Sequence, residues 1–209
     1  MQIDLFNNSE QTNKQVSLEA ALSIHGLELY FDFITKEEEN QLLKNIDDNQ
    51  WLNDLSRRVQ HYGYKYDYRA RKIDNSFYLG ELHNWLNELA LNLYHKNLIE
   101  FIPDQAIINE YEPGQGIASH IDCEPCFGDT IISLSLGSTC IMNFSREVND
   151  LERIPILLEP RSLVIMKKES RYGWYHGIPA RKSDKFNDKV IKRERRVSIT
   201  FRKVINNNF

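Results

Sequence analysis

The sequence contains few cysteines and no long hydrophobic run. Cys123, Cys126 and Cys140 are the only cysteines among the 209 residues, a number that is too small and odd for the disulfide framework of a small secreted domain. No stretch approaches the roughly 20 apolar residues that cross a bilayer. Residues 1–4 show neither the basic start nor the apolar stretch of a secretory signal. We therefore expect an intracellular, cytoplasmic protein with no membrane partner.

The composition is otherwise that of a soluble globular protein. Hydrophobic residues make up 41% of the chain and charged residues 27%, which are ordinary values. The length suits a single domain with its own core. Residues 1–26 show no clear periodicity and are expected to form an irregular arm, with one domain over 27–209. We expect a monomer.

Positive charge gathers in two segments although the net charge is −4. Segment 57–72 holds six basic residues against one acidic residue, and segment 181–203 holds ten against three. Such asymmetry can attract a phosphate backbone even when the whole chain is acidic. Two solvated loops would explain the same pattern. The basic, polar stretch 181–196 is predicted to be a mobile loop.

Two helices are predicted in the first half of the chain. Thr35 followed by Glu38 is typical of a capping box that opens a helix ending near Asp48. A second helix is predicted over 80–96, where leucines and a tryptophan recur at three- and four-residue steps. That stripe consists of Leu82, Trp85, Leu86, Leu89 and Leu93, with His83 and His95 lying off it.

Short apolar or alternating segments follow Pro103, and turn residues separate them. They cover residues 106–111, 130–136, 140–144, 156–158, 162–166, 171–176 and 197–201. Many short strands at this spacing indicate a sandwich or barrel. Two helices followed by a run of strands predict an α+β domain whose helices pack on one outer face of the sheet.

The His120-Ile121-Asp122 segment carries the first candidate metal ligands. Side chains two apart on a strand project to the same side, so His120 and Asp122 can bind one ion together. Two histidines and one carboxylate on one face leave three positions open, as Fe(II) needs for a cosubstrate and O₂. His176 is a suitable third ligand. An H-x-D motif is common by chance, so a second feature has to decide between a metal site and ordinary histidines.

The strand predicted near the C-terminus provides that feature. Arg196 and Arg202 are six residues apart in an alternating segment, so both guanidinium groups project to one face with Ser198 and Thr200 between them. Unpaired charge on a half-buried strand is costly and demands an anionic partner. A dicarboxylate such as 2-oxoglutarate would answer that demand.

These motifs together resemble the AlkB family of Fe(II)/2-oxoglutarate-dependent dioxygenases. The family pattern N-x-Y, H-x-D, a distant H and R-x(5)-R appears in order as Asn109-Glu110-Tyr111, His120-Ile121-Asp122, His176 and Arg196…Arg202. Tyr62-Gly63-Tyr64-Lys65-Tyr66 and Glu169-Ser170-Arg171 also look familial. The resemblance spans roughly residues 57–204, and the ordered combination is far more specific than any one motif.

The resemblance implies a double-stranded β-helix, or jelly-roll, core over 104–204, with a nucleotide-recognition lid at 57–72. It implies Fe(II) on His120, Asp122 and His176. It implies 2-oxoglutarate held by Asn109, Tyr111, Arg196, Ser198 and Arg202. The implied reaction uses O₂ and 2-oxoglutarate, releases succinate and CO₂, and hydroxylates a substrate carbon, and an N-alkyl group is then lost as an aldehyde.

Six residues are expected to bind the substrate. They are Arg57, Tyr64, Lys65, Tyr66, Glu124 and Arg171. Glu124 is placed to accept a hydrogen bond from the exocyclic amine of a flipped-out base, with a solvated loop glutamate as the alternative. Tyrosines interleaved with basic residues in 57–72 fit stacking plus phosphate contacts, and a plain exposed hairpin would also fit.

The expected activity is oxidative dealkylation of N-alkylated bases in single-stranded DNA or RNA, as in DNA repair or RNA demethylation. The amino-acid sequence of Asn109–Gly116 most resembles that of the tRNA-modifying branch of the family. That branch carries further domains for which 209 residues leave no room, and Glu124 departs from it. Hydroxylation of a tRNA wobble-uridine side chain, or of a protein, is therefore the alternative.

Two other classes of function remain as hypotheses. One is a non-catalytic nucleic-acid binder on a degenerate oxygenase scaffold, and the other is a structural metal-binding cupin-type domain. The second leaves the Arg196/Arg202 face unexplained. Cys123 and Cys126 are expected to be incidental loop cysteines, because a zinc site needs four ligands and no second cysteine pair exists.

Overall fold

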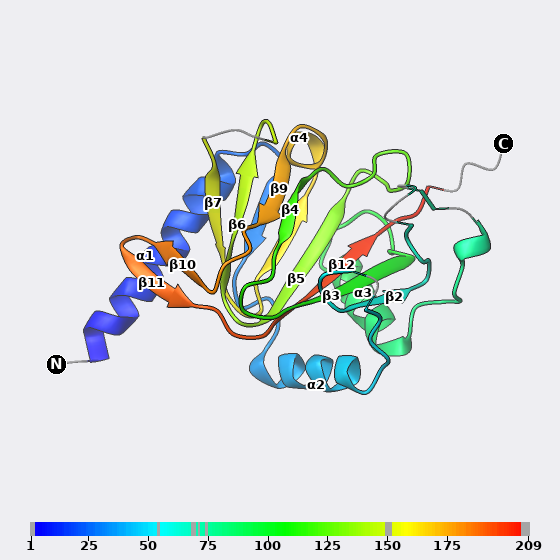
Figure 1. Cartoon of the computed structure of the whole chain (residues 1–209), viewed down its shortest axis with the longest axis horizontal. Coiled ribbons are helices and arrows are strands. Elements are labelled where there is room, and N and C mark those ends of the chain that lie inside the picture. Colours follow the sequence, from blue (N-terminus) through cyan, green and yellow to red (C-terminus); the bar gives the residue numbers. More distant parts are fainter. Residues whose placement is uncertain are drawn as a thin grey trace.

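Two antiparallel β-sheets face each other in a jelly roll (Figure 1). A computed structural model describes residues 3–53, 55–67, 70, 72–73, 75–148 and 152–205. The six-stranded sheet has the order β1-β8-β5-β12-β3-β2, and the four-stranded sheet has the order β4-β9-β6-β7. The strands of the larger sheet are β1 (Leu27–Tyr30), β2 (Val59–Tyr62), β3 (Gln105–Tyr111), β5 (Ile131–Gly137), β8 (Leu163–Met166) and β12 (Arg196–Arg202). Those of the smaller sheet are β4 (Ile117–His120), β6 (Cys140–Ser145), β7 (Ile154–Leu158) and β9 (Tyr175–Ile178).

Four α-helices and one short 3₁₀ helix surround the sheets. They are α1 (Ile3–Leu22), α2 (Lys36–Asp47), η1 (Asn75–Phe77), α3 (Asn84–His95) and α4 (Lys168–Tyr172). The predicted capping box is confirmed: the Thr35 side chain accepts a hydrogen bond from the Glu38 backbone N–H, and the Glu38 carboxylate accepts one from the Thr35 N–H. The second predicted helix is confirmed as α3, and its two flanking histidines are exposed.

Alternation along the strands sorts apolar from polar side chains. On β12, Val197, Ile199 and Phe201 pack in the cluster that α2 and α3 cover. The side chains between them belong to the opposite face, toward the four-stranded sheet. Arg196 and Arg202 are buried there, with 3% and 9% exposure. The predicted polar face of this strand therefore lies inside the molecule.

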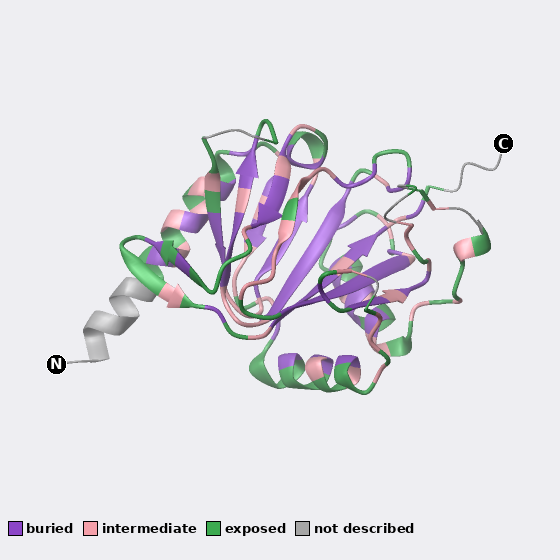
Figure 2. Cartoon of the chain, viewed as in Figure 1, coloured by how far each residue is buried: buried purple, intermediate pink, exposed green. Residues whose placement is uncertain are grey.

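The core divides into two main layers. One cluster includes Phe144, Ile156 and Met166 and lies between the two sheets. The other packs Leu86 and Leu93 of α3, with α2, on the outer face of the six-stranded sheet. Figure 2 shows this buried interior as the purple central strands. The helices α2 and α3 thus cover one outer face, as predicted.

The irregular arm predicted for residues 1–26 is wrong for most of its length, because Ile3–Leu22 form helix α1. This helix packs against β7 and β1, away from α2 and α3 (Figure 1). Its buried stripe is Asn13, Ser17 and Ala21, at four-residue steps. Ser17 is wholly buried, and its hydroxyl accepts a hydrogen bond from the Leu157 N–H. A small and polar stripe gives no hydrophobic periodicity, so the sequence pattern missed it.

Two predictions in the C-terminal third are also corrected. The strand expected over 171–176 is shorter at its start and longer at its end. Residues 171 and 172 belong to α4, and the strand β9 covers Tyr175–Ile178. The loop expected over 181–196 is mostly a hairpin of β10 (Ser183–Phe186) and β11 (Lys189–Lys192). Arg193 fixes its base through two hydrogen bonds to the buried Asp184 carboxylate, at 2.6 and 2.8 Å.

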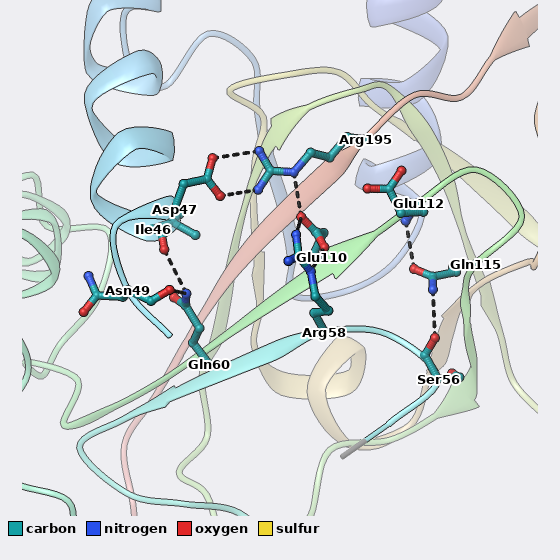
Figure 3. A network of polar contacts seen from close by, with 10 residues as sticks. All are labelled: Ile46, Asp47, Asn49, Ser56, Arg58, Gln60, Glu110, Glu112, Gln115 and Arg195. Carbon is teal, nitrogen blue, oxygen red and sulfur yellow. Dashed lines mark hydrogen bonds and ion pairs between the residues drawn. The ribbon is translucent and has the colours of Figure 1, made fainter. Parts of the chain in front are cut away.

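Several arginines of the two basic segments pair with carboxylates. Arg58 and Arg195 both donate to the buried Glu110 carboxylate, and Arg195 also pairs with Asp47 (Figure 3). In segment 181–203, Arg181 and Arg193 pair with Asp184 and Arg202 pairs with Asp122, whereas Arg196 has no carboxylate partner among the described residues. Three residues of the predicted lid, Tyr68, Arg69 and Arg71, lie outside the described residues. None of the described helices has the length and apolar character needed to span a membrane.

A buried carboxylate ties α2 to the six-stranded sheet and generates a stability prediction. Glu39 is fully buried and accepts hydrogen bonds from the Gly137 N–H, Lys36 and Arg161. Burial opposes its ionisation, but these donors outweigh burial and lower the pKa of Glu39 below 4.5. We expect Glu39→Ala to lower the unfolding free energy by about 3 kcal/mol at pH 7, measured by urea denaturation. The substitution leaves the Gly137 N–H, Lys36 and Arg161 without their acceptor.

The matched control is Glu37→Ala, an exposed position in the same helical turn, which should change stability by less than about 1 kcal/mol. A lowered folded-state pKa means that the Glu39 contribution is present above pH 4.5 and is lost as the pH falls through that pKa. The gap between wild type and Glu39→Ala should therefore narrow in acid. An equal cost for both substitutions would contradict this account.

Candidate active site

Three ligand-type side chains meet between the two sheets. One ligand atom from each of His120, Asp122 and His176 lies within 4.8 Å of the others. The imidazole centroids are 4.5 Å apart, and His176 Nε2 lies 3.5 Å from Asp122 Oδ2. Among the residues that the structure describes, this is the one group of three or more such residues close enough to share an ion.

Strand pairing produces this meeting. His120 ends β4 and stands directly opposite His176 of β9 in the antiparallel register. Asp122 follows two residues after His120, on the same side of the chain. His120 Nδ1 lies 2.9 Å from the Ala118 carbonyl oxygen. A proton on Nδ1 therefore leaves Nε2 as the metal-binding atom, and the backbone contact fixes the ring orientation.

The electrostatics suit a cation. Burial disfavours a charged Asp122, but Arg202, whose Nη2 lies 2.6 Å from Oδ1, outweighs it and holds the pKa of that carboxyl far below its usual range. Burial, with His120 nearby, lowers the pKa of His176 to about 3. At neutral pH the site thus offers a carboxylate and a neutral imidazole, the forms that bind metal.

A buried pair of guanidinium groups stands beside these ligands without a complete set of partners. Arg196 Nη2 donates to Ser135 Oγ at 2.8 Å, yet its Nε and Nη1 are buried with no hydrogen-bond partner among the described residues. The same holds for Arg202 Nε. Buried donors of a charged group are costly to leave unmet. A dicarboxylate fits the demand, and 2-oxoglutarate is one.

All of these groups line one cavity of about 1030 Å³. Its wall includes the three candidate ligands and all five residues predicted to hold the cosubstrate, the two arginines among them. Asn109, Tyr111 and Ser198 lie there together, and Ser198 is directly opposite Asn109 in the sheet register. The cavity has room for a cosubstrate and for part of a further molecule.

Arg57 lines the same cavity as Asn109 and Tyr111 and contacts both. It was expected to bind substrate, but it is buried, and its Nε donates to Asn109 Oδ1 at 2.8 Å. Tyr111 lies between two guanidinium groups, with Arg57 at 5.5 Å and Arg196 at 5.3 Å from its ring centroid. Arg57 therefore orients two of the residues predicted to hold 2-oxoglutarate.

The remaining residues predicted to bind substrate are not all brought to the cavity. Glu124 and Tyr66 line it, whereas Tyr64 and Lys65 are not among its described lining residues. Arg171 was also predicted to bind substrate. Its side chain is only 2% exposed, and it donates hydrogen bonds to backbone carbonyl groups instead. Those acceptors are the carbonyl groups of Asp122, Cys123, Phe127 and Gly128. Its position supports the loop after β4.

Three residues in contact with the site were not predicted. Ser135 receives a hydrogen bond from Arg196, and Gln105 lies 3.5 Å from Arg202. Phe127 lies between the Arg202 guanidinium, 4.7 Å from its ring, and the Tyr66 ring at 5.5 Å. The alternation Ser133-Leu134-Ser135 places serines on one strand face, which was an available signal for Ser135.

The loop after Asp122 contains a disulfide, contrary to expectation. Cys123 and Cys126 are bonded and buried, whereas Cys140 is free. The prediction that both are incidental loop cysteines is therefore wrong; a CxxC pair alone makes no zinc site, but it can close a disulfide. The bond closes a short turn in which the N–H groups of Cys126 and Phe127 approach the Cys123 carbonyl at 3.2 Å. Together with Arg171, it fixes the segment that carries Asp122 and Glu124.

Comparison with known proteins agrees with this geometry. Residues 35–202 match the family model described as the 2OG-Fe(II) oxygenase superfamily. The chain is 39% identical over 197 residues to uncharacterized protein L905 of Acanthamoeba polyphaga mimivirus, covering 92% of this chain and 91% of that protein. It is 39% identical over 211 residues to the Arabidopsis thaliana "Alkylated DNA repair protein ALKBH8 homolog", covering 90% and 61%.

A third relative is the Xenopus tropicalis "tRNA (carboxymethyluridine(34)-5-O)-methyltransferase alkbh8", 38% identical over 200 residues and covering 86% of this chain. The chain spans 61% of the Arabidopsis protein and 32% of the Xenopus protein. The solved structure of OsALKBH1 superposes with a TM-score of 0.66 at 16% identity, covering 85% of this chain and 96% of that one, which shows a shared fold.

The disulfide generates the prediction of this subsection. Closing a loop of four residues stabilises a fold by about 2 kcal/mol in the chain-entropy account. We expect dithiothreitol to lower the unfolding free energy of the wild type by about that amount, measured by chemical denaturation. Cys126→Ser should already lack this contribution and should not respond to dithiothreitol, whereas Cys140→Ser should respond like the wild type. A wild type that is indifferent to reductant would refute the bond.

Proposed function

Because the chain belongs to the 2OG-Fe(II) oxygenase superfamily and, within it, to the AlkB family, we propose that it oxidises a carbon substituent on a nucleic-acid base. The chain is an Fe(II)/2-oxoglutarate-dependent dioxygenase with an α+β jelly-roll core. The observation that carries the proposal is the meeting of His120, Asp122 and His176 in a cavity that also holds two incompletely paired arginines.

In this proposal the three ligands hold Fe(II), and Arg196 and Arg202 hold 2-oxoglutarate. Arg196 takes the distal carboxylate, because its unmet donors lie deep in the cavity and Ser135 already orients it. Asn109 and Tyr111 complete the cosubstrate site, together with Ser198. The donor set suits Fe(II), which accepts imidazole and carboxylate ligands and needs open positions.

When bound, Fe(II) and 2-oxoglutarate use O₂ to oxidise a substrate C–H bond and release succinate and CO₂. The chain's own residues fix the geometry. Arg202 keeps the Asp122 carboxylate ionised, and burial keeps His176 neutral. Tyr66 packs on Phe127 at the cavity wall, which helps to exclude water from the reacting atoms.

For the substrate, we favour the side chain of a modified uridine in tRNA. Among the relatives described above, the Xenopus protein is named for carboxymethyluridine 34 of tRNA. Identity of 38% over 86% of the present chain supports a related substrate. This order reverses the sequence-based preference for N-alkylated bases, which rested on Glu124 and on chain length.

One observation keeps N-alkyl bases as the second candidate. Glu124 is exposed and lines the cavity two residues after Asp122. A carboxylate at this wall can accept a hydrogen bond from the exocyclic amine of adenine or cytosine. The Arabidopsis relative is named for repair of alkylated DNA. The two candidates differ in product: a uridine side chain would keep its new hydroxyl, whereas an N-methyl group would leave as formaldehyde.

Arg196 gives a prediction that does not depend on the substrate. Arg196→Met removes the donors but preserves most of the packing. A ligand at 100 times its Kd stabilises a protein by about 2.7 kcal/mol. We expect the wild type with Mn(II) to gain about that much from 2-oxoglutarate in thermal denaturation, and we expect Arg196→Met to lose the gain. Stabilisation by Mn(II) alone should persist in the variant. An undiminished response to 2-oxoglutarate would remove Arg196 from the cosubstrate site.

The substrate prediction is tested with a panel of oligonucleotides read by mass spectrometry. The panel holds anticodon stem-loops with carboxymethyluridine or its methyl ester at position 34, and single strands with 1-methyladenine or 3-methylcytosine. We expect the uridine side chain to gain one oxygen atom with Fe(II), 2-oxoglutarate and O₂, because hydroxylation of a side-chain carbon leaves the new oxygen on the product.

Asp122→Asn is the control and should form no product from any of these oligonucleotides. Loss of a methyl group with release of formaldehyde from the methylated strands, and no change in uridine, would establish the second candidate. Succinate formation without change in any oligonucleotide would overturn the nucleic-acid proposal.

A further inference from the structure

A second cavity, of about 590 Å³, lies on the outer face of the four-stranded sheet. We propose that it binds the nucleotide next to the target base, an inference that rests on the proposed function. The volume falls within the roughly 300–1,000 Å³ of small-molecule sites. It shares seven lining residues with the first cavity, among them Ile117, Ala118 and Ser119 of β4. A polynucleotide can therefore place one base between the sheets while its neighbour crosses β4.

Asn143 supplies the polar group that points to a ligand. Its strand neighbours Met142 and Phe144 pack in the core between the sheets, so alternation turns Asn143 to the outer face. There it is half-buried and lines the second cavity. Among the described residues no group hydrogen-bonds its side-chain amide. An amide donates and accepts, so it can recognise a base edge or a ribose hydroxyl.

Hydrogen bonds hold the part of the cavity wall that contains Ser56, Gln115 and Pro179 in place before any ligand binds. Gln115 donates to the Ser56 carbonyl at 2.8 Å and accepts from the Glu112 N–H at 2.8 Å (Figure 3). The buried Arg193 donates to the Pro179 carbonyl at 2.7 Å. These contacts join three chain segments around the cavity. A preformed wall costs less entropy on binding than one that must order itself.

The charge around this cavity favours a phosphate. No carboxylate occurs among its described lining residues, and Arg153 is one of them. Lys182 stands at the rim, because its Cγ lies 3.9 Å from the position where a Cβ on Gly114 would be. Lys182 is exposed, with no ion pair among the described residues. The lining combines small apolar residues, which a ribose and base can contact, with the Asn143 amide, and the basic rim can receive the phosphate.

The experiment measures binding of fluorescently labelled decauridylate RNA to the full chain by anisotropy, with uridine 5′-monophosphate as the competitor that lacks a neighbouring nucleotide. We expect Asn143→Asp to raise the decauridylate Kd about tenfold, because it adds a negative charge beside the phosphate. Asn143→Ser, the milder variant, should weaken it less. Neither substitution should change the concentration of uridine 5′-monophosphate that displaces half of the labelled decauridylate.

Lys182→Ala should lower the slope of log K against log salt by about one. The matched control is Lys189→Ala, an exposed lysine of β11 that also has no ion pair among the described residues but, unlike Lys182, is not recorded next to a residue of the cavity lining. It should change neither the slope nor the Kd. Melting temperatures confirm that each variant is folded.

The outcomes separate the two proposals. Wild-type binding of decauridylate with unchanged binding by Asn143→Asp and Lys182→Ala would overturn the second site and leave the proposed function standing. Equal weakening of monophosphate and decauridylate would place Asn143 at the target nucleotide and also overturn the inference. A wild type that binds neither decauridylate nor a deoxyribonucleotide decamer would contradict both the second nucleotide site and the proposed action on nucleic acid.

Discussion

The ion pair between Arg202 and Asp122 joins the two sheets at the point on which the site depends. Arg202 ends β12 in the six-stranded sheet, and Asp122 follows β4 in the four-stranded sheet, with 2.6 Å between their atoms. Both groups are nearly excluded from water, so each needs the other's charge. The pair keeps the carboxylate ionised and turns its second oxygen toward His176. One contact thus bridges the two sheets and orients a candidate metal ligand.

Much of the site could be predicted because its residues obey strand periodicity. The even spacing of Arg196 and Arg202 places both on one face in any β-strand, and the spacing of His120 and Asp122 does the same. The helices α2 and α3 were equally accessible, since a capping box and a leucine stripe are local signals. Predictions that rest on geometry fixed within a few residues were the reliable ones.

The features that were missed depend on contacts between distant segments. Helix α1 buries Asn13, Ser17 and Ala21, which fit only because β7 offers a backbone N–H to Ser17. The basic hairpin is ordered by the Arg193–Asp184 pair, and no composition rule distinguishes such a pair from solvated charges. Arg57 was expected to face substrate, but its partner Asn109 is 52 positions away. In each case a contact between separate elements or loops decides the structure, and local sequence patterns do not reveal such contacts.

Iron binding tests the account most directly. Under anaerobic conditions, Fe(II) and 2-oxoglutarate chelated together give a visible charge-transfer absorption band. The account predicts this band at one iron per chain in the wild type and in His83→Ala, whose histidine is exposed, and predicts its loss in His176→Ala. A wild type without the band, or a His176→Ala variant that retains it at the same affinity, would contradict the shared metal site.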